Sequence, residues 1–466
     1  MRLIIYFLGG SYIHPIFLKY IGINLLIKLP EQVQIGGYIM ATKKKTIDMI
    51  GNDDSLLIDE LREFTSTSDK YTLRHEAGFD VQYPTGFLNV DFMNGLRVHV
   101  YNEAKGLDFK YDSIGIVDGS INMFIGRSGS GKSTIMKQWA ANIIRPFNHG
   151  VIVEASIEGG IVSRRNEILT GFSPMELKKK LRSRNEGVSI ESCYDEIKAI
   201  RDLKIKKEDK YRYNTGLVDS LGYDIYKFQP TVYIIDSLAM LVPEKLTQEE
   251  ELSGQMSTTA TAKSLATFFR RITPILKEAN IILFIVNHIT QQVDINPYAH
   301  AKTQNRFLKQ GETTPGGVTP FLLSNNIFRL DDNTKLTNDK EFGIDGCIVT
   351  ISMVKSRTNT AGSSTLLVFN PQAGFDADLS LYLMLKDNGY INGAGAYLYI
   401  EDRDDKKFSQ KQLKQKLIED PEFTGIFVNA CVKCLESSLD KDEAIINASK
   451  DISTNAILQA INQINK

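Results

Sequence analysis

The sequence Gly126-Arg127-Ser128-Gly129-Ser130-Gly131-Lys132-Ser133-Thr134 satisfies the pattern G-x-x-x-x-G-K-[ST]. It follows the apolar run INMFI at 121–125 and precedes the helix-like run TIMKQWAANII at 134–144. Glycines let successive backbone N–H groups turn toward phosphate oxygens, and the N-terminus of the following helix favours the same negative charge. Lys132 is expected to reach the β- and γ-phosphates, and Ser133 to supply a hydroxyl to Mg²⁺. The pattern therefore predicts a P-loop that binds ATP and Mg²⁺.

Strand-like apolar runs alternate with helix-like segments on both sides of this loop. Between residues 85 and 372 these runs are INMFIG, GVIVEAS, TVYIID, IILFIVN, GCIVTISMV and STLLVFN. Such alternation predicts an α/β fold with a mostly parallel sheet and helices on both faces. The polar stretches 159–229 and 289–316 are expected to be long connections, which in such folds are usually functional or mobile.

Composition limits the classes of protein that fit this chain. Its 466 residues allow about three domains at roughly 150 residues each. The 55 Lys and Arg against 56 Asp and Glu exclude a histone-like surface, so any contact with DNA must be local. Four scattered cysteines indicate a reducing compartment, the cytoplasm, and Cys431-x-x-Cys434 is expected to reflect helix spacing. The apolar start has no uninterrupted run of about 20 residues, so no membrane partner is expected.

Carboxylates at strand ends supply the remaining candidates for phosphate chemistry. The apolar run at 231–236 ends in Asp236, which is expected to hold Mg²⁺, usually through water. Hydrolysis also needs a group that orients or deprotonates the attacking water. Glu158 lies just past the strand GVIVEAS and is the preferred base, because a side chain there could face the γ-phosphate. Glu154, within that strand, remains an alternative, and both carboxylates could also be surface groups.

Six further segments resemble, in order, the motifs of RecA-type recombinases, including the phage UvsX group. They are TGFLNVD at 85–91, YIIDSLAMLVP at 233–243, IILFIVNHIT at 281–290, TTPGG at 313–317, MVKSRT at 353–358 and AGAYLYI at 394–400. The resemblance implies a RecA-like P-loop ATPase core with small N- and C-terminal domains. The expected boundaries are 40–84 for an N-terminal oligomerisation segment, 85–375 for the core with its DNA loops, 376–436 for the C-terminal domain and 437–466 for a tail.

The start of the chain suggests a different origin for residues 1–39. Gly36 and Gly37 shortly precede Met40, and two glycine codons can spell the purine-rich ribosome-binding site of a bacterial message. We therefore expect residues 1–39 to be a translated upstream extension and the native protein to begin at Met40.

The same resemblance implies roles for individual residues. His288 would sense the γ-phosphate and couple it to the adjoining DNA loop, while Lys355 and Arg357 would complete the ATP site of a neighbouring subunit. The acidic stretch 246–257 would be the first DNA loop. In the second loop, 289–316, amides, cations and aromatic rings suit single-stranded DNA, and the candidates are Gln291, Gln292, Tyr298, Lys302, Arg306, Phe307 and Lys309.

These implications amount to an ATP-dependent, DNA-stimulated recombinase that forms helical filaments and pairs single-stranded DNA with a homologous duplex. Single-strand-binding and mediator proteins are expected partners, in the host cytoplasm if a phage encodes the chain. A hexameric replicative helicase with the same core, or a non-catalytic ATP-binding DNA coat, remains open. Basic clusters in 159–229, including Lys178–Lys180 and Lys204, are expected to be a solvated helix face or an auxiliary DNA or partner surface.

Overall fold

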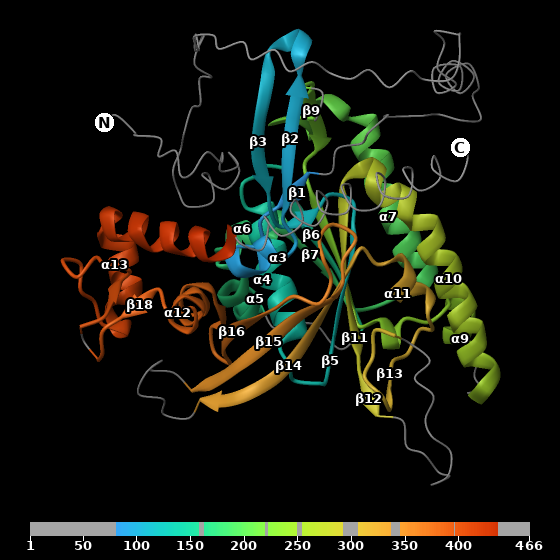
Figure 1. The fold of residues 1–466 in the computed structure, drawn as a ribbon. Coiled ribbons are helices and arrows are strands. Elements are labelled where there is room, and N and C mark those ends of the chain that lie inside the picture. The colour runs from blue at the N-terminus through green and yellow to red at the C-terminus, as the bar shows by residue number, and fades with distance from the viewer. Residues whose placement is uncertain are drawn as a thin grey trace, which may run out of the picture. The chain divides into compact units, whose positions relative to one another are not determined.

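A central β-sheet organises the computed structural model, which describes residues 81–157, 163–219, 222–248, 254–291, 306–336, 345–395 and 397–436. Nine strands form this sheet within the described ranges (Figure 1). Their spatial order is β17 (Gly374–Asp376), β16 (Ser364–Asn370), β15 (Gly346–Lys355), β14 (Asn326–Leu336), β5 (Ile121–Gly126), β11 (Ile281–His288), β10 (Thr231–Asp236), β6 (Val151–Ser156) and β7 (Leu181–Arg184).

Strand direction divides the sheet into two parts. The six strands from β14 to β7 run parallel, and β15, β16 and β17 are added antiparallel at one side. The expected α/β fold with a mostly parallel sheet is confirmed. Residues 1–39 and 437–466, and nearly all of the 40–84 segment, lie outside the described residues, so the predictions for them are not tested.

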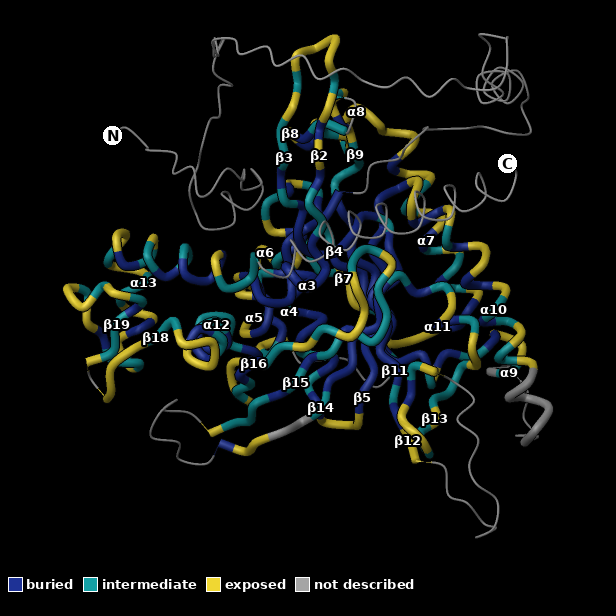
Figure 2. Tube along the Cα trace, in the orientation of Figure 1, coloured by how far each residue is buried: buried dark blue, intermediate teal, exposed yellow. Residues whose placement is uncertain are grey.

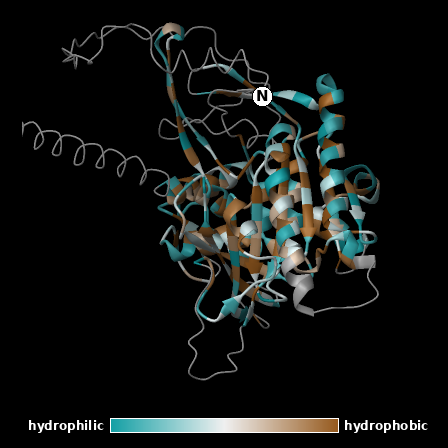
Figure 3. Ribbon diagram, turned by 90° about the vertical axis from the view of Figure 1, so that its right-hand side faces the viewer, coloured by the Kyte–Doolittle hydropathy of each residue, from teal (hydrophilic) through white to brown (hydrophobic). Residues whose placement is uncertain are grey.

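Side chains of the parallel strands build a hydrophobic core on each face of the sheet. Figure 3 shows the hydrophobic residues along the ribbon in brown. On one face, Trp139 of α4 (Lys132–Ile144) packs against Phe124 and Phe328, with ring centroids 5.3 and 5.2 Å apart. On the other face, α7 (Ile190–Lys206) and α10 (Gly254–Ala279) cover side chains such as Tyr233 and Leu283. Helices therefore lie on both faces, as expected for strands whose side chains are buried on both sides of the sheet.

Residues 163–228 contain regular structure, so the expectation of one long polar connection is wrong. Ser173 and Ser189 begin helices with reciprocal capping boxes, a local signal for a helix start. Ile190, Cys193 and Ile197 then bury the apolar face of α7 against the sheet, while its other face stays polar. The elements are α5 (Ser163–Thr170), α6 (Pro174–Lys180), β7, α7, α8 (Glu208–Tyr211), β8 (Arg212–Val218) and β9 (Asp224–Phe228).

Two hairpins that the sequence analysis did not anticipate pack against each other (Figures 1 and 2). β2 (Leu96–Asn102) pairs with β3 (Leu107–Ser113), and β8 pairs with β9. The Tyr111 hydroxyl donates to the carbonyl of Val218 at 3.1 Å, and the Lys105 ammonium lies 3.7 Å from the ring centroid of Tyr223. The alternation of apolar and polar residues in LRVHVYN and LDFKYDS is the signal that predicts such strands.

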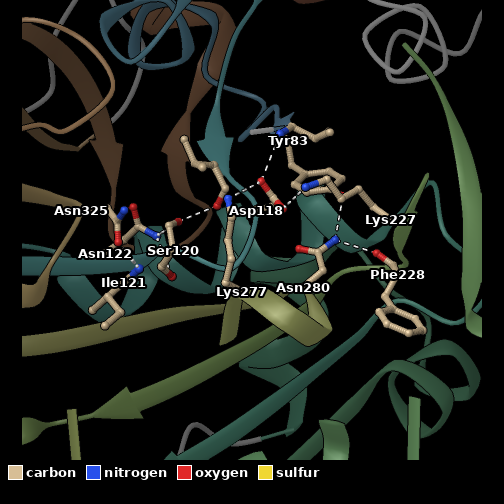
Figure 4. A network of polar contacts seen from close by, with 12 residues as sticks. Tyr83, Asp118, Ser120, Ile121, Asn122, Lys227, Phe228, Lys277, Asn280 and Asn325 are labelled. Atoms are coloured by element: carbon tan, nitrogen blue, oxygen red, sulfur yellow. Dashed lines mark hydrogen bonds and ion pairs between the residues drawn. The ribbon is translucent and has the colours of Figure 1, made fainter. Parts of the chain in front are cut away.

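A buried carboxylate ties the first described residues to the sheet (Figure 4). Asp118 accepts the backbone N–H of Val81 at 3.0 Å and pairs with Lys227 at 2.8 Å and Lys277 at 3.2 Å. It follows β4 (Ile116–Val117), which pairs with β1 (Gln82–Tyr83). This network lies at the amino ends of the parallel strands, opposite the edge that carries the P-loop.

Residues 377–436 form a mainly helical region that shares a hydrophobic cluster with the core of the chain. Phe408 and Phe423 pack with ring centroids 5.1 Å apart, in a cluster that also includes Phe92 of α3 (Leu88–Met93). Cys431 and Cys434 lie on the helix at 421–436, where Cys431 is buried and Cys434 is partly exposed. The other elements are α12 (Ala377–Asp387), β18 (Ile391–Asn392), β19 (Tyr399–Ile400) and α13 (Leu413–Glu419).

Lys204 is buried, so a solvated helix face is the wrong interpretation for this residue. Its ammonium donates to the carbonyls of Gln229 at 2.8 Å, Ala279 at 2.8 Å and Asn280 at 3.3 Å. Ala279 is the last residue of α10, where a cation complements the helix dipole. Burial nevertheless lowers the pKa of Lys204 to about 7.

This buried lysine predicts a rise in stability with pH. Between about pH 7 and pH 10 the unfolded chain binds a proton at Lys204 that the folded chain does not, so the free energy of unfolding should increase. The slope should approach about 1.4 kcal/mol per pH unit. Urea unfolding of wild type and Lys204→Met at pH 7, 8 and 9 measures this. If the free energy of unfolding changed with pH in the same way in both proteins, Lys204 would keep its proton in the folded state and the prediction would be wrong.

Candidate functional site

The loop between β5 and α4 has the backbone that its glycines predict. Gly129 and Gly131 adopt left-handed conformations, with φ of 81° and 87°. A Cβ at Gly126 would lie 2.6 Å from the carbonyl oxygen of Leu330 on β14, which is too close for a side chain. The Lys132 ammonium donates to the carbonyls of Gly126 at 3.1 Å and Arg127 at 2.6 Å. The lysine thus lies inside the curve of the loop.

Strand register aligns the other predicted phosphate-site residues with this loop. His288, the last residue of β11, lies opposite Gly126 on the neighbouring parallel strand. The next residue along, Ile289, donates its backbone N–H to the Gly126 carbonyl at 3.1 Å. Asp236 ends β10 and lies opposite Ser156 at the end of β6. The carboxyl ends of four parallel strands therefore bring the P-loop, Asp236 and His288 to one edge of the sheet.

Two side chains at this edge, those of Ser133 and Asp236, are suitable ligands for Mg²⁺. Ser133 lies in the first turn of α4, directly after Lys132, and Asp236 is 7% exposed. Hydroxyl and carboxylate oxygens are the ligands that Mg²⁺ prefers in proteins. The donor set fits the predicted ion. No group of three or more His, Cys, Asp or Glu arranged for a metal occurs among the residues that the structure describes.

Of the two candidate bases, Glu154 and Glu158, the structure describes only Glu154. Glu154 is 1% exposed and pairs with Lys137 of α4 at 2.9 Å. The same carboxylate accepts the Ser183 hydroxyl at 3.0 Å, and Lys137 also donates to Asn166 at 2.7 Å. Glu154 is therefore held in a buried network that joins four elements. Glu158 lies outside the described residues.

A short strand pair closes the second predicted DNA loop at its base. β12 (Thr290–Gln291) pairs antiparallel with β13 (Glu312–Thr313). Gln291, a candidate for DNA contact, is exposed on β12. The amide of Asn287, on β11, donates to the carbonyl of Pro315 at 3.1 Å. The loop thus begins and ends beside the strand that carries His288, while Gln292, Tyr298 and Lys302 lie outside the described residues.

Three further candidates on this loop make contacts within the chain. The ring of Phe307 stacks on Phe321, with centroids 6.2 Å apart and planes 6° from parallel. The Arg306 guanidinium lies 4.8 Å from the Phe307 centroid. Lys309 is exposed and pairs with Asp331 at 3.2 Å. One face of the Phe307 ring is therefore engaged by the core, and contact of these residues with DNA stays a prediction.

Lys355 and Arg357 lie beside the same aromatic pair. The Lys355 ammonium is 5.7 Å from the Phe307 centroid and donates to the carbonyls of Phe321 at 2.8 Å and Leu322 at 2.7 Å. Arg357 donates to the Leu322 carbonyl at 2.7 Å. Burial, with repulsion from Arg357 and Arg306, lowers the pKa of Lys355 to about 8. The predicted inter-subunit cations thus lie at the base of the second loop.

The first predicted DNA loop and the AGAYLYI segment are described in part. Residues 246–248 end α9 (Glu244–Gln248) and residues 254–257 begin α10, while 249–253 lie outside the described ranges. The segment at 394–400 contributes β19 and an exposed Tyr397. Neither arrangement tests a contact with DNA.

Comparisons with protein-family models and with curated proteins find no match for this chain. Within the described residues, no helix has the length and apolar character needed to cross a membrane. Function must therefore be inferred from the residues and geometry of the P-loop edge.

Proposed function

We propose that this chain is an ATP-dependent recombinase of the RecA/UvsX type, built on a RecA-like P-loop core. The observation that carries the proposal is the alignment of His288 with Gly126, with the closed base of the second loop directly beyond His288. β11 therefore connects the phosphate site directly to a loop whose composition suits single-stranded DNA, so nucleotide binding could alter the position of that loop.

In this proposal, the residues of the P-loop edge divide the work of phosphoryl transfer. The backbone N–H groups of 126–134 and the Lys132 ammonium bind the triphosphate, and Ser133 and Asp236 hold Mg²⁺. The metal ion, when bound, neutralises charge on the phosphates. Glu158 orients the attacking water, since Glu154 is already paired with Lys137.

Assembly supplies the remaining cations. Lys355 and Arg357 of one subunit would reach the ATP of its neighbour, which makes hydrolysis depend on a filament. A head-to-tail interface that does not close gives an open helix, in which weak DNA contacts repeat along one strand. This explains how a chain with a formal net charge of −1 can bind DNA tightly. Single-strand-binding and mediator proteins in the cytoplasm of a cell, or of a phage host, are the expected partners.

A D-loop assay tests the proposal. With ATP and Mg²⁺, the protein should form joint molecules between supercoiled duplex and a homologous single strand, and none with a heterologous strand of equal length. Lys132→Ala should form none with either. ATPase stimulated by single-stranded DNA without joint molecules would favour a ring-shaped helicase, and filaments without either activity would favour a passive DNA coat.

A further inference from the structure

A buried ion pair anchors the base of the second loop to the central sheet. Arg329, on β14, donates from its two terminal nitrogens to the two carboxylate oxygens of Glu312, both at 2.7 Å. The two side chains are 7% and 6% exposed. A bidentate pair shielded from water restrains orientation as well as distance, because both bonds must break for either group to turn.

Neighbouring groups complete this anchor. The Nε of Arg329 donates to Asp331 at 2.8 Å, and the Glu312 carboxylate also accepts the backbone N–H of Lys309 at 2.9 Å. The hydrogen bonds from Arg329 lower the pKa of Glu312, which keeps the pair charged at neutral pH. We call residues 306–313 with β12 the loop foot. Glu312 thus makes the buried attachment of the foot to β14, and the exposed Lys309 adds an ion pair with Asp331 at 3.2 Å.

The attachment lies next to the P-loop strand. Arg329 is in register with Ile125 of β5, and the following residue, Leu330, is in register with Gly126. On the other side of β5, His288 is also in register with Gly126, and β11 leads directly to β12. The foot is therefore connected to both strands that flank β5, at the level where the P-loop begins.

We propose that Glu312 and Arg329 are positioning residues that fix the loop foot to β14 and thereby make the DNA affinity of the loop depend on nucleotide at the P-loop. The coupling half of this inference rests on the proposed function, and the anchoring half does not. Neither side chain is expected to touch nucleotide. A residue with a purely structural role would alter stability without changing how DNA affinity responds to ATP.

Hydrogen exchange on the full chain without ligands tests the anchoring half. In Glu312→Gln, amides of 306–313 should exchange about tenfold faster than in wild type, because a neutral amide holds the guanidinium less firmly. Asp112→Asn is the matched control: it weakens a bidentate pair with Arg97 on the β2–β3 hairpin, at 2.7 and 3.1 Å and outside the loop foot, so exchange of 306–313 should not change. Equal exchange of 306–313 in wild type and Glu312→Gln would overturn the anchor.

Single-strand DNA affinity, measured with and without a non-hydrolysable ATP analogue, tests the coupling half. Wild type should bind single-stranded DNA at least about tenfold more tightly with the analogue than without it. For Glu312→Gln the analogue should change DNA affinity by less than about twofold, although both proteins bind the analogue equally well. If Glu312→Gln folds poorly, Arg329→Lys takes its place in this test. Arg329→Lys keeps the positive charge but loses the bidentate geometry of the guanidinium, so it should show the same weak response to the analogue. A full response in both variants would overturn the coupling. No response in wild type would instead refute the proposed function, with the exchange data still deciding the anchor.

Discussion

Lys132→Ala should reduce hydrolysis of MgATP by at least about 10²–10³-fold in kcat/KM. Lys132 is 4% exposed, and its ammonium lies within the loop, where it donates to the carbonyls of Gly126 and Arg127. In this water-poor position a positive charge stabilises the transferring phosphoryl group far more than it would at the surface. Steady-state hydrolysis with saturating single-stranded DNA measures the loss.

A control must separate lost chemistry from lost folding. Lys335→Ala removes an exposed lysine from β14 and should leave both hydrolysis and thermal unfolding unchanged. Lys132→Ala should also keep a melting temperature within a few degrees of wild type, because the carbonyls of Gly126 and Arg127 that Lys132 binds belong to its own loop. Undiminished hydrolysis in a folded Lys132→Ala protein would mean that the loop does not bind the phosphates.

Local patterns were sufficient to predict the strands and the glycine-rich turn between β5 and α4. INMFIG and TVYIID are strands with the expected bounds, because continuous apolar runs of this length must be buried on both faces of a parallel sheet. The glycine spacing likewise predicts the loop, whose conformation depends on residues adjacent in sequence. The phosphate-site candidates His288 and Asp236 follow apolar strands, so the parallel arrangement alone brings them to one edge.

Contacts between residues that are distant in sequence explain the features that the sequence patterns did not predict. β14 contains Arg329, Asp331 and Asp332 and does not read as a buried strand. Its arginine is buried because Glu312, together with Asp331, neutralises it, and nothing local to Arg329 or Glu312 predicts that these two residues pair. Phe307 similarly looks like a base-stacking residue until Phe321 is found against one face of its ring. Such contacts depend on the tertiary fold, which hydrophobic periodicity does not specify.

Glu158→Gln should lower the rate of hydrolysis, whereas Glu154→Gln should lower stability, and together the two variants identify the base. Glu158→Gln should lower kcat by about 10²–10⁴-fold with ATP binding, DNA binding and stability retained, because only proton transfer or water orientation is lost. Hydrolysis rates, nucleotide affinity, single-stranded DNA affinity and urea unfolding of each variant measure these four properties. If Glu158→Gln hydrolyses ATP normally, Glu154 becomes the better candidate.

Glu154→Gln should instead destabilise the protein, because the Lys137 ammonium, 3% exposed, would lose its charged partner. Removing one member of a buried ion pair costs about 3–5 kcal/mol. The double variant Lys137→Gln/Glu154→Gln removes both charges and should recover much of that loss, since neither group is then left buried and unpaired. Normal kcat in this double variant would assign Glu154 to the fold, whereas a stable, inactive double variant would assign it to the chemistry.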